Sequence, residues 1–324
     1  MKISIVVPTY KRPALLTKCM AALLKQTFDT DDFEIIIVSD GPDHVSHLLT
    51  KLIRLEKKKY NIVYLQLPAK GGPAAARNMG WKNAAGELIV FTDDDCIPSE
   101  NWLEAYWQAY AEANLRDVVF TGKVIVPISE KPTDYEKNIQ NLETAEFITA
   151  NCACSKPALE KAKGFDEDFK MAWREDSALH FDFLNLHIPV TKVYAATVTH
   201  PVRKVPWGVS IQEQRKGLYN ALLYKKHRAL YNRHIAATPP SNYYLMVLAL
   251  TVGLVALTME KSIWAVVCFS IWGILSLAFA GKRLQNTRRD VSHIAEMLVS
   301  SLIIPFASVF WNLVGAVRFK VFHL

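Results

Sequence analysis

Cysteine is scarce in this sequence and follows no recognisable pattern. The chain of 324 residues has five cysteines, an odd number, and only Cys152 and Cys154 lie close together, as a C-x-C pair. Disulfide frameworks and structural zinc sites both need several ligand residues at set spacings. We therefore expect a reducing compartment, no disulfide and no zinc site, and we interpret the C-x-C pair as structural.

Signals for secretion and for nucleic-acid binding are also missing. Residues 1–8 are largely apolar but soon reach Pro8, so we expect a first strand there and not a signal peptide. The formal net charge of +7 is modest, and no nucleic-acid-binding motif accompanies it. We therefore expect no nucleic-acid partner, whereas basic residues near the apolar C-terminal end suit an anionic membrane face.

Apolar sequence is in excess, and it is concentrated after Pro240. The hydrophobic content of 51% is high for a soluble enzyme. Segments 243–258 and 263–280 carry no charge, and each is close to the lower limit of about 17–20 residues for a membrane span. We expect a helical hairpin over about 243–280, with both ends in the cytoplasm because basic residues face that side. These basic residues are Arg228, Arg233, Lys282, Arg283, Arg288 and Arg289.

The last apolar segment, 294–317, is less uniform than the other two. It contains Glu296, Pro305 and Asn312, and basic residues follow it. A third span would place that basic end outside, so we expect interfacial or re-entrant helices over about 291–319, broken at Pro305. The alternative is that the whole tail is a buried interface of a homo-oligomer. The expected organisation is a catalytic domain over 1–235 and a membrane region over 236–324, in the inner membrane of the cell.

The first two hundred residues alternate between apolar runs and helical patterns. Strands are expected at residues 3–7, 33–38, 62–67, 88–92, 118–126 and 190–198. Such alternation is typical of an α/β fold with a doubly wound, mostly parallel sheet flanked by helices. Three of the runs end on polar residues, at Thr9, Asp40 and Asp93. In open α/β sheets the carboxyl ends of the strands form the ligand crevice.

Three adjacent aspartates follow the fourth apolar run. Residues 88–92 predict a strand buried on both faces, and Asp93, Asp94 and Asp95 come directly after it. Adjacent carboxylates repel one another and need cations to neutralise them. Mg²⁺ and Mn²⁺ prefer such oxygen ligands and share them with phosphates. The sequence therefore predicts a divalent-cation site, and a solvated acidic turn is the alternative.

Five short motifs follow one another along residues 1–234. They are Val6-Val7-Pro8-Thr9-Tyr10-Lys11-Arg12, Val38-Ser39-Asp40-Gly41, Ala76-Arg77-Asn78, Thr92-Asp93-Asp94-Asp95 and Glu175-Asp176. In this order and spacing they resemble the motifs of family 2 glycosyltransferases, which are inverting enzymes of the GT-A fold. The resemblance implies a hexosyltransferase-type enzyme with a nucleotide-sugar donor, in particular a UDP-sugar, a divalent cation (Mn²⁺ or Mg²⁺) and a carboxylate base.

The resemblance also implies roles for single residues. The nucleotide base would lie against Pro8, Thr9 and Tyr10 and would donate a hydrogen bond to Asp40. The general base would be Asp176, with Glu175 beside it, and the metal ligands would be Asp95, Asp93 and His200. Further contacts to the donor are implied for Arg12, Arg77, Asp93 near the ribose, Asp94 at the sugar and Arg215 at the diphosphate. Trp173 either stacks on a sugar or only packs.

These residue types suit sugar transfer. Negative charge develops on the leaving diphosphate, and a metal held by carboxylates offsets it. A carboxylate within hydrogen-bond reach can take the proton of the attacking hydroxyl, which contributes about 10²–10⁴ in rate. A single displacement inverts the anomeric centre. The sequence shows no Ser–His or Cys–His nucleophile that would indicate a covalent intermediate.

Two departures from the family pattern bear on the acceptor. The Q-x-x-R-W motif of processive synthases corresponds to residues 212–216, where Lys216 replaces the tryptophan. We therefore expect transfer of one sugar to a lipid-linked or membrane-proximal glycan, and not polymer synthesis. Lys163 stands where relatives often have glycine before Gly164-Phe165-Asp166, which leaves the fit of the acceptor open.

Two other functions remain as alternatives. A sugar nucleotidyltransferase also begins with a βαβ unit and uses acidic metal ligands, but its first loop is usually rich in glycine. Here that loop, residues 8–12, has no glycine. The second alternative is a catalytically inactive membrane scaffold of the same fold, and the intact Asp93, Asp95 and Asp176 argue against it.

Overall fold

The computed structural model describes residues 1–114, 116–236 and 240–322, which divide into two units. The first unit consists of Met1–Pro127 and Gln140–Val202, and the second of Ile128–Ile139 and Arg203–Leu324. The chain therefore passes between the units three times. The predicted boundary at residue 235 differs from this division, because residues 203–235 and a short internal segment belong to the second unit.

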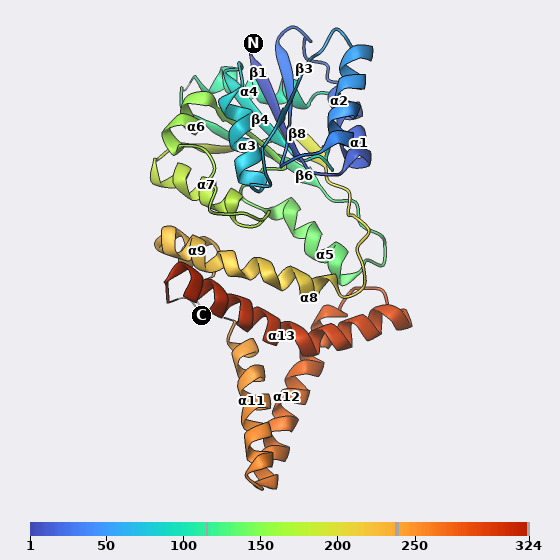
Figure 1. Cartoon of the computed structure of the whole chain (residues 1–324), viewed down its shortest axis with the longest axis vertical. Helices are drawn as coiled ribbons and strands as arrows, with labels where there is room; N and C mark the ends of the chain where they lie inside the picture. Colours follow the sequence, from blue (N-terminus) through green and yellow to red (C-terminus); the bar gives the residue numbers. More distant parts are fainter. Residues whose placement is uncertain (115, 237–239, 323–324) are drawn as a thin grey trace. The chain divides into compact units, whose positions relative to one another are not determined.

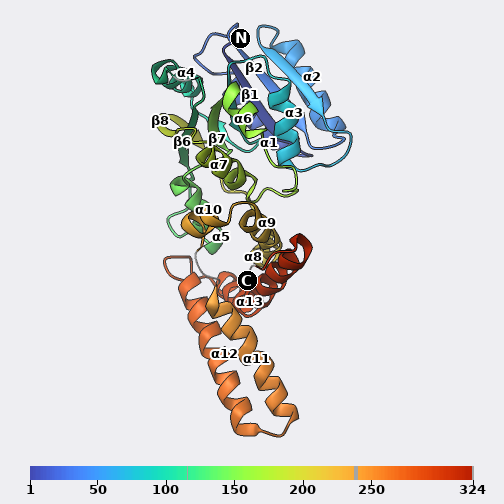
Figure 2. The same cartoon turned by 90° about the vertical axis from the view of Figure 1, so that its left-hand side faces the viewer.

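A mixed sheet of eight strands runs through the first unit, in the order β3-β2-β1-β4-β7-β6-β8-β5 (Figures 1 and 2). Strands β1 to β4 are mutually parallel, as are β6 and β8, whereas β7 is antiparallel to β4 and β6, and β5 to β8. The predicted α/β fold is confirmed. The strands are β1 (Ile3–Thr9), β2 (Phe33–Ser39), β3 (Asn61–Gln66), β4 (Leu88–Thr92), β5 (Ile97–Pro98), β6 (Val119–Ile125), β7 (Asn151–Ser155) and β8 (Val190–Thr199).

Helices flank this sheet, and several begin where local chemistry favours a helix start. Pro13 and Pro73 lie in the first turns of α1 and α3, where a missing N–H costs nothing. Asp43 caps α2 by accepting a hydrogen bond from Ser46 N. The helices of this unit are α1 (Pro13–Leu23), α2 (His44–Glu56), α3 (Pro73–Lys82), α4 (Trp102–Ala113), η1 (Asn141–Thr144), α6 (Lys156–Ala162) and α7 (Glu175–Asn185).

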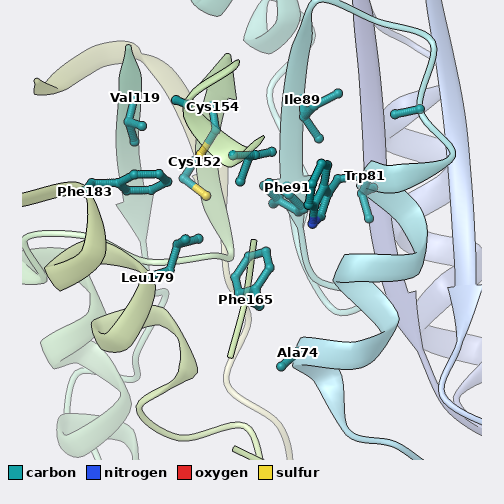
Figure 3. Packing of buried hydrophobic residues seen from close by; sticks show 14 of the residues in the cluster. Ala74, Trp81, Ile89, Phe91, Val119, Cys152, Cys154, Phe165, Leu179 and Phe183 are labelled. Carbon is teal, nitrogen blue, oxygen red and sulfur yellow. The ribbon is translucent and has the colours of Figure 1, made fainter. Parts of the chain in front are cut away.

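A hydrophobic core packs β4 and β7 of the sheet against α7. Figure 3 shows Ile89 and Phe91 of β4 close to Cys152 and Cys154, with Phe165 and Phe183 packed around them. All residues of β4 are buried, as the unbroken apolar run predicts. Both thiols are free and buried, which agrees with a structural role for the C-x-C pair.

The second unit is helical. Its helices are α5 (Asp134–Gln140, whose last residue falls in the first unit), α8 (Val209–Glu213), η2 (Gln214–Gly217), α9 (Leu218–Lys226), α10 (Arg228–His234), α11 (Ser241–Thr258), α12 (Ser262–Arg283) and α13 (Val291–Phe319). A 3₁₀ turn follows α5 directly, and another separates α8 from α9.

Three of these helices, α11, α12 and α13, are long and apolar enough to cross a membrane by length and composition. The first two form the predicted hairpin (Figure 2). The predicted break at Pro305 is wrong, because α13 is one continuous helix of 29 residues with Pro305 inside it. A proline removes one backbone hydrogen bond, and long apolar helices tolerate this loss where neighbouring helices pack against them.

Candidate functional site

The carboxyl ends of β1, β2 and β4 lie side by side and gather polar residues. These three strands are neighbours and parallel, so the residues after them meet at one edge of the sheet. Thr9 Oγ1 donates a 2.8 Å hydrogen bond to Asp94 Oδ2, and Asp40 N donates one of 2.9 Å to Thr9 O. Thr9 therefore lies next to the aspartate triplet, which it reaches through Asp94, and Asp40 lies next to Thr9.

Arg77 of α3 joins the two acidic motifs. Its Nη2 donates to Asp93 Oδ1 at 2.8 Å and its Nη1 donates to Glu175 Oε1 at 3.1 Å. Burial would lower the pKa of this guanidinium, but the charges of Asp93 and Glu175 outweigh burial and raise it. Arg77 is only 2% exposed, so little of it can touch a ligand. The geometry supports a positioning role, and the donor contact that the resemblance implied for Arg77 stays a prediction.

The middle aspartate of the triplet is held by the loop after β1. Asp94 accepts from Thr9 Oγ1 and, at 3.2 Å, from Arg12 Nη1. Burial raises the pKa of Asp94 to about 6, against the opposing effects of Arg12 and Thr9. Both carboxylate oxygens therefore have protein partners, and the sugar contact implied for Asp94 and the donor contact implied for Arg12 stay predictions.

Asp95 and His200 form the candidate metal site. The ligand atoms of Asp95, Cys96 and His200 lie within 4.8 Å of one another, and His200 Nε2 is 3.7 Å from Asp95 Oδ1. The buried His200 Nδ1 makes no hydrogen bond to any described residue. Burial raises the pKa of the Cys96 thiol well above its usual value, and sulfur is a soft ligand that Mg²⁺ and Mn²⁺ do not prefer.

The Asp95 carboxylate suits Mn²⁺ or Mg²⁺, and the His200 imidazole is a borderline ligand that favours a transition-metal ion such as Mn²⁺ over Mg²⁺. The structure delivers His200 to this place directly after β8, where His200 N donates to Ile125 O at 2.8 Å. Asp93, also implied as a ligand, does not join this group among the described residues, because its Oδ1 accepts from Arg77. Asp95 and His200 therefore fit a divalent cation best.

Asp40 and Tyr10 lie on the side where the nucleotide base is expected. Asp40 Oδ1 accepts hydrogen bonds of 2.7 Å from both Gly71 N and Gly72 N, so a base would have to use Oδ2. The Tyr10 ring has Lys70 Nζ at 4.9 Å from its centroid, and a Cβ on Gly41 would lie 3.3 Å from the ring. Lys70 was not predicted, and its only signal in the sequence is its place just before Gly71-Gly72.

Asn78, next to Arg77, fixes the loop that follows α6. Its Nδ2 donates to Phe165 O and Glu167 Oε1, and its Oδ1 accepts from Phe165 N and Trp81 Nε1, all at 2.8 Å. The amide is fully satisfied, which makes this a rigid junction. Helix α3 thus positions both the acidic motifs and the loop 164–169. No pattern in the sequence indicates the contact from Asn78 to Glu167.

Glu175 and Asp176 begin α7, and their surroundings differ. Burial, followed by the charge of Asp176, raises the pKa of Glu175 to about 7 against the effect of Arg77. Burial also raises the pKa of Asp176, whose Oδ1 accepts from Ser177 N at 2.6 Å. Glu175 is buried and bound to Arg77, while Asp176 is only half-buried. This difference favours Asp176 as the proton acceptor.

Two further predicted residues are less closely tied to this site. Trp173 is 38% exposed, and the Arg174 guanidinium lies 4.7 Å from its ring centroid. Arg215 belongs to η2 in the second unit, where its guanidinium lies 5.7 Å from the Trp311 ring centroid. A sugar contact by Trp173 and a diphosphate contact by Arg215 stay predictions.

Comparison with curated proteins finds glycosyltransferases. The poly(ribitol-phosphate) beta-glucosyltransferase of Bacillus spizizenii is 40% identical over 126 residues, which cover 38% of this chain and 19% of that protein. The glycosyltransferase GlyG of Streptococcus pneumoniae is 36% identical over 117 residues, covering 36% of this chain and 37% of that protein. The chain thus matches well under half the length of these relatives.

Solved structures share the fold at low sequence identity. A mannosyltransferase from Pyrobaculum calidifontis, in complex with GDP-Man and Mn²⁺, has a TM-score of 0.61 at 16% identity, covering 96% of this chain and 87% of that one. TarS 1–349 of S. aureus, in complex with UDP-GlcNAc, has a TM-score of 0.53 at 17% identity, covering 100% of this chain and 93% of that one.

The family model for glycosyl transferase family 2 matches residues 4–166, half of the chain. This range includes the ends of β1, β2 and β4, helix α3 and the aspartate triplet, which form most of the site described above. The chain belongs to glycosyl transferase family 2.

Proposed function

We propose that this glycosyltransferase moves one sugar, with inversion, from a UDP-sugar to a glycan acceptor at a membrane surface. The observation that carries the proposal is the Arg77 bridge, which brings the aspartate triplet to the Glu175–Asp176 pair. The relatives support the choice of substrates, because one is named for a poly(ribitol-phosphate) acceptor and one structure contains UDP-GlcNAc.

The proposed roles follow from the surroundings of each side chain. Tyr10 and Asp40 would hold the nucleotide base, and Asp176 would accept the proton of the acceptor hydroxyl. As that proton leaves, the hydroxyl oxygen forms a bond to the anomeric carbon, and the bond from this carbon to the diphosphate breaks. The electron pair of the broken bond leaves with the nucleoside diphosphate, so no covalent enzyme intermediate is required.

Asp95 and His200 would hold a divalent cation, Mn²⁺ or Mg²⁺. When bound, such an ion offsets the negative charge that develops on the leaving diphosphate. Arg77 would keep the acids in place, because it donates hydrogen bonds to both Asp93 and Glu175. Arg12 would neutralise part of the remaining acidic charge through Asp94.

A membrane location is proposed from helices α11 to α13, each long and apolar enough to span a bilayer. Lys282 and Arg283 end α12, and basic ends favour the cytoplasmic side. The proposed location is therefore the inner membrane, with the catalytic unit in the cytoplasm, where nucleotide sugars are available. A lipid-linked or membrane-proximal glycan is the acceptor that suits this location.

The proposal is tested by separating donor binding from transfer in two variants. Asp176→Asn should bind the UDP-sugar normally but transfer it about 10²–10⁴-fold more slowly, because a general base contributes that much. Asp95→Asn should lose the Mn²⁺-dependent part of donor binding in calorimetry. Asp31→Asn, an exposed aspartate between β1 and β2, is the matched control. Full transfer activity of a folded Asp95→Asn variant in chelator would contradict the proposal.

The donor and the reaction type are tested in the same preparation. UDP-, GDP- and dTDP-sugars are compared for thermal stabilisation in the presence of Mn²⁺, and we expect the UDP-sugars to stabilise most. The product is then analysed: a transferase releases a nucleoside diphosphate, whereas a nucleotidyltransferase would release pyrophosphate. Release of pyrophosphate would assign the second function, and absence of any nucleotide-sugar binding would assign the inactive scaffold.

A further inference from the structure

Helix α2 exposes four of its apolar residues, whereas two others, Leu49 and Ile53, are half-buried. Its buried residues are Ser46 and Thr50, whereas Val45, Leu48, Leu52 and Leu55 are 58%, 45%, 64% and 56% exposed. A helix at the surface of a soluble domain normally does the opposite. The helix lies beside β3, the edge strand of the sheet (Figure 1), and no described residue covers these four side chains.

Contacts to β3 set the rotation of α2 against the sheet. Tyr64 Oη donates to Asp43 O at 3.1 Å, Asp43 N donates to Gln66 Oε1 at 3.3 Å, and the His47 and Tyr64 rings stack with their centroids 4.9 Å apart. Turning the helix about its axis would break these contacts. The outward stripe of Val45, Leu48, Leu52 and Leu55, called the α2 stripe below, is therefore a permanent feature of the surface.

The α2 stripe has the spacing of a coiled coil. Its residues are separated by three, four and three positions, which is the a/d pattern of two heptads. Val45 and Leu52 take a positions, and Leu48 and Leu55 take d positions. Amphipathic helices in general share this spacing, so the charges that flank the stripe decide which partner it suits.

Charges beside the stripe suit a second copy of the same helix. In this register Lys51 takes a g position and Glu56 the following e position, and both are exposed. In a parallel pair, g of one helix faces the following e of the other, so Lys51 would face Glu56 of the second copy twice, once on each side. An antiparallel pair would not bring these opposite charges together.

We propose that two copies of this chain associate through a parallel pairing of their α2 helices along the α2 stripe. The helix is already folded against the sheet, so pairing does not require the ordering of a free segment, which lowers the entropy cost. Two heptads form a small interface, and we expect a reversible dimer whose population depends on concentration.

The first test measures the mass of the detergent-solubilised full chain by mass photometry over a range of concentrations. The wild type should form dimers, and Leu48→Glu/Leu52→Glu should weaken dimerisation at least tenfold without unfolding, because both positions are exposed. Arg54→Glu places the same charge on α2 outside the stripe and is the matched control. A monomeric wild type, or an unchanged dimer in the double variant, would overturn the proposal.

The second test examines the parallel orientation. In a parallel pair Leu48 meets Leu48 of the second copy, so Leu48→Cys should form a disulfide-linked dimer on mild oxidation, in a Cys268→Ser background because the other native cysteines are buried. Arg54→Cys should not. Lys51→Glu should weaken the dimer, and Lys51→Glu/Glu56→Lys should restore it. Absence of the Leu48→Cys cross-link or of this restoration would contradict parallel pairing.

Discussion

At the level of single residues, Arg77 has the greatest influence on the site. A buried arginine bound to two carboxylates contributes little net stability, because desolvation offsets most of the attraction. Its importance lies in specifying geometry: Asp93 and Glu175 are far apart in the sequence, and one side chain fixes both. We infer that this part of the site is rigid before any ligand binds, since both acids already have their partner.

The raised pKa of Glu175 predicts how stability depends on pH. Its folded-state pKa of about 7 lies above the ordinary 4.5, so the folded state binds more protons between these values. The contribution of Glu175 to stability is therefore full below about pH 4.5 and is lost as pH rises through 7. We predict that the thermal midpoint of Glu175→Gln, relative to that of the wild type, increases as the pH rises from 5 to 8.

The control for this prediction is Glu160→Gln, an exposed carboxylate on α6, whose difference from the wild type should stay constant across the same range. Loss of the hydrogen bond to Arg77 affects Glu175→Gln at every pH. The test is therefore whether the difference in thermal midpoint between this variant and the wild type changes with pH. A difference that does not vary with pH would show that Glu175 is already charged at pH 5.

At the level of elements, the strand ends could be predicted because their signal is local. The apolar runs before Thr9, Asp40 and Asp93 predict buried parallel strands, and parallel neighbours bring their carboxyl ends to one edge of the sheet. Strand β7 was missed because Asn151-Cys-Ala-Cys-Ser has little strand preference of its own. It forms where β4 and β6 supply antiparallel partners on both sides, and such tertiary pairing overrides local propensity.

The contacts between site residues could not be predicted in the same way. Arg77 reaches Asp93 and Glu175 only because α3 has a particular rotation about its axis. Asn78 reaches Phe165 only because the loop 164–169 follows a particular path. No periodicity in the sequence indicates the rotation of a helix or the path of a loop. Lys70, which lies beside Tyr10 where the nucleotide base is expected, was not predicted either, because a single lysine in a loop does not indicate a function.

The start of α3 depends on a backbone conformation that favours glycine. Gly72 has φ +96°, and a Cβ there would lie 2.8 Å from Lys170 O. We predict that Gly72→Ala lowers the free energy of unfolding by about 1–3 kcal/mol, the usual range for such strain, and weakens UDP-sugar binding, because Gly72 N also donates to Asp40. The measurements are thermal unfolding and calorimetry.

Gly273→Ala is the matched control for this substitution. A Cβ on Gly273 of α12 would meet nothing within 4 Å, and alanine favours a helix over glycine, so stability should stay equal or rise slightly. Normal donor affinity in Gly72→Ala would mean that the hydrogen bond from Gly72 to Asp40 does not position the base site.

At the level of the whole molecule, the internal segment Ile128–Ile139 and the C-terminal helices fold as one unit. Arg283 at the end of α12 donates to Asp134 Oδ2 through Nη2 at 2.7 Å and Nε at 3.1 Å. It also donates to Ser300 and Ser301 of α13 and to Ser210 of α8. One guanidinium thus connects four helices, and its side chain is 8% exposed.

We predict that Arg283→Ala destabilises the second unit by about 3 kcal/mol, because it leaves Asp134 without its charge partner in a largely buried place. Arg283→Lys should recover only part of this loss, since lysine cannot reproduce the fork of donors. The thermal midpoint in detergent measures the effect, and Arg289→Ala, an exposed arginine nearby in the sequence, is the control. Equal midpoints for Arg283→Ala and Arg289→Ala would refute the prediction.

The ion pair between Asp134 and Arg283 also has a consequence for the order of events on the ribosome. Its partners are 149 residues apart in the chain, which at translation rates of 5–20 residues per second is a delay of roughly 7–30 s. The nascent segment around Asp134 emerges first and must remain hydrated until α12 has been synthesised. The second unit therefore folds late, only after Arg283 has left the ribosome.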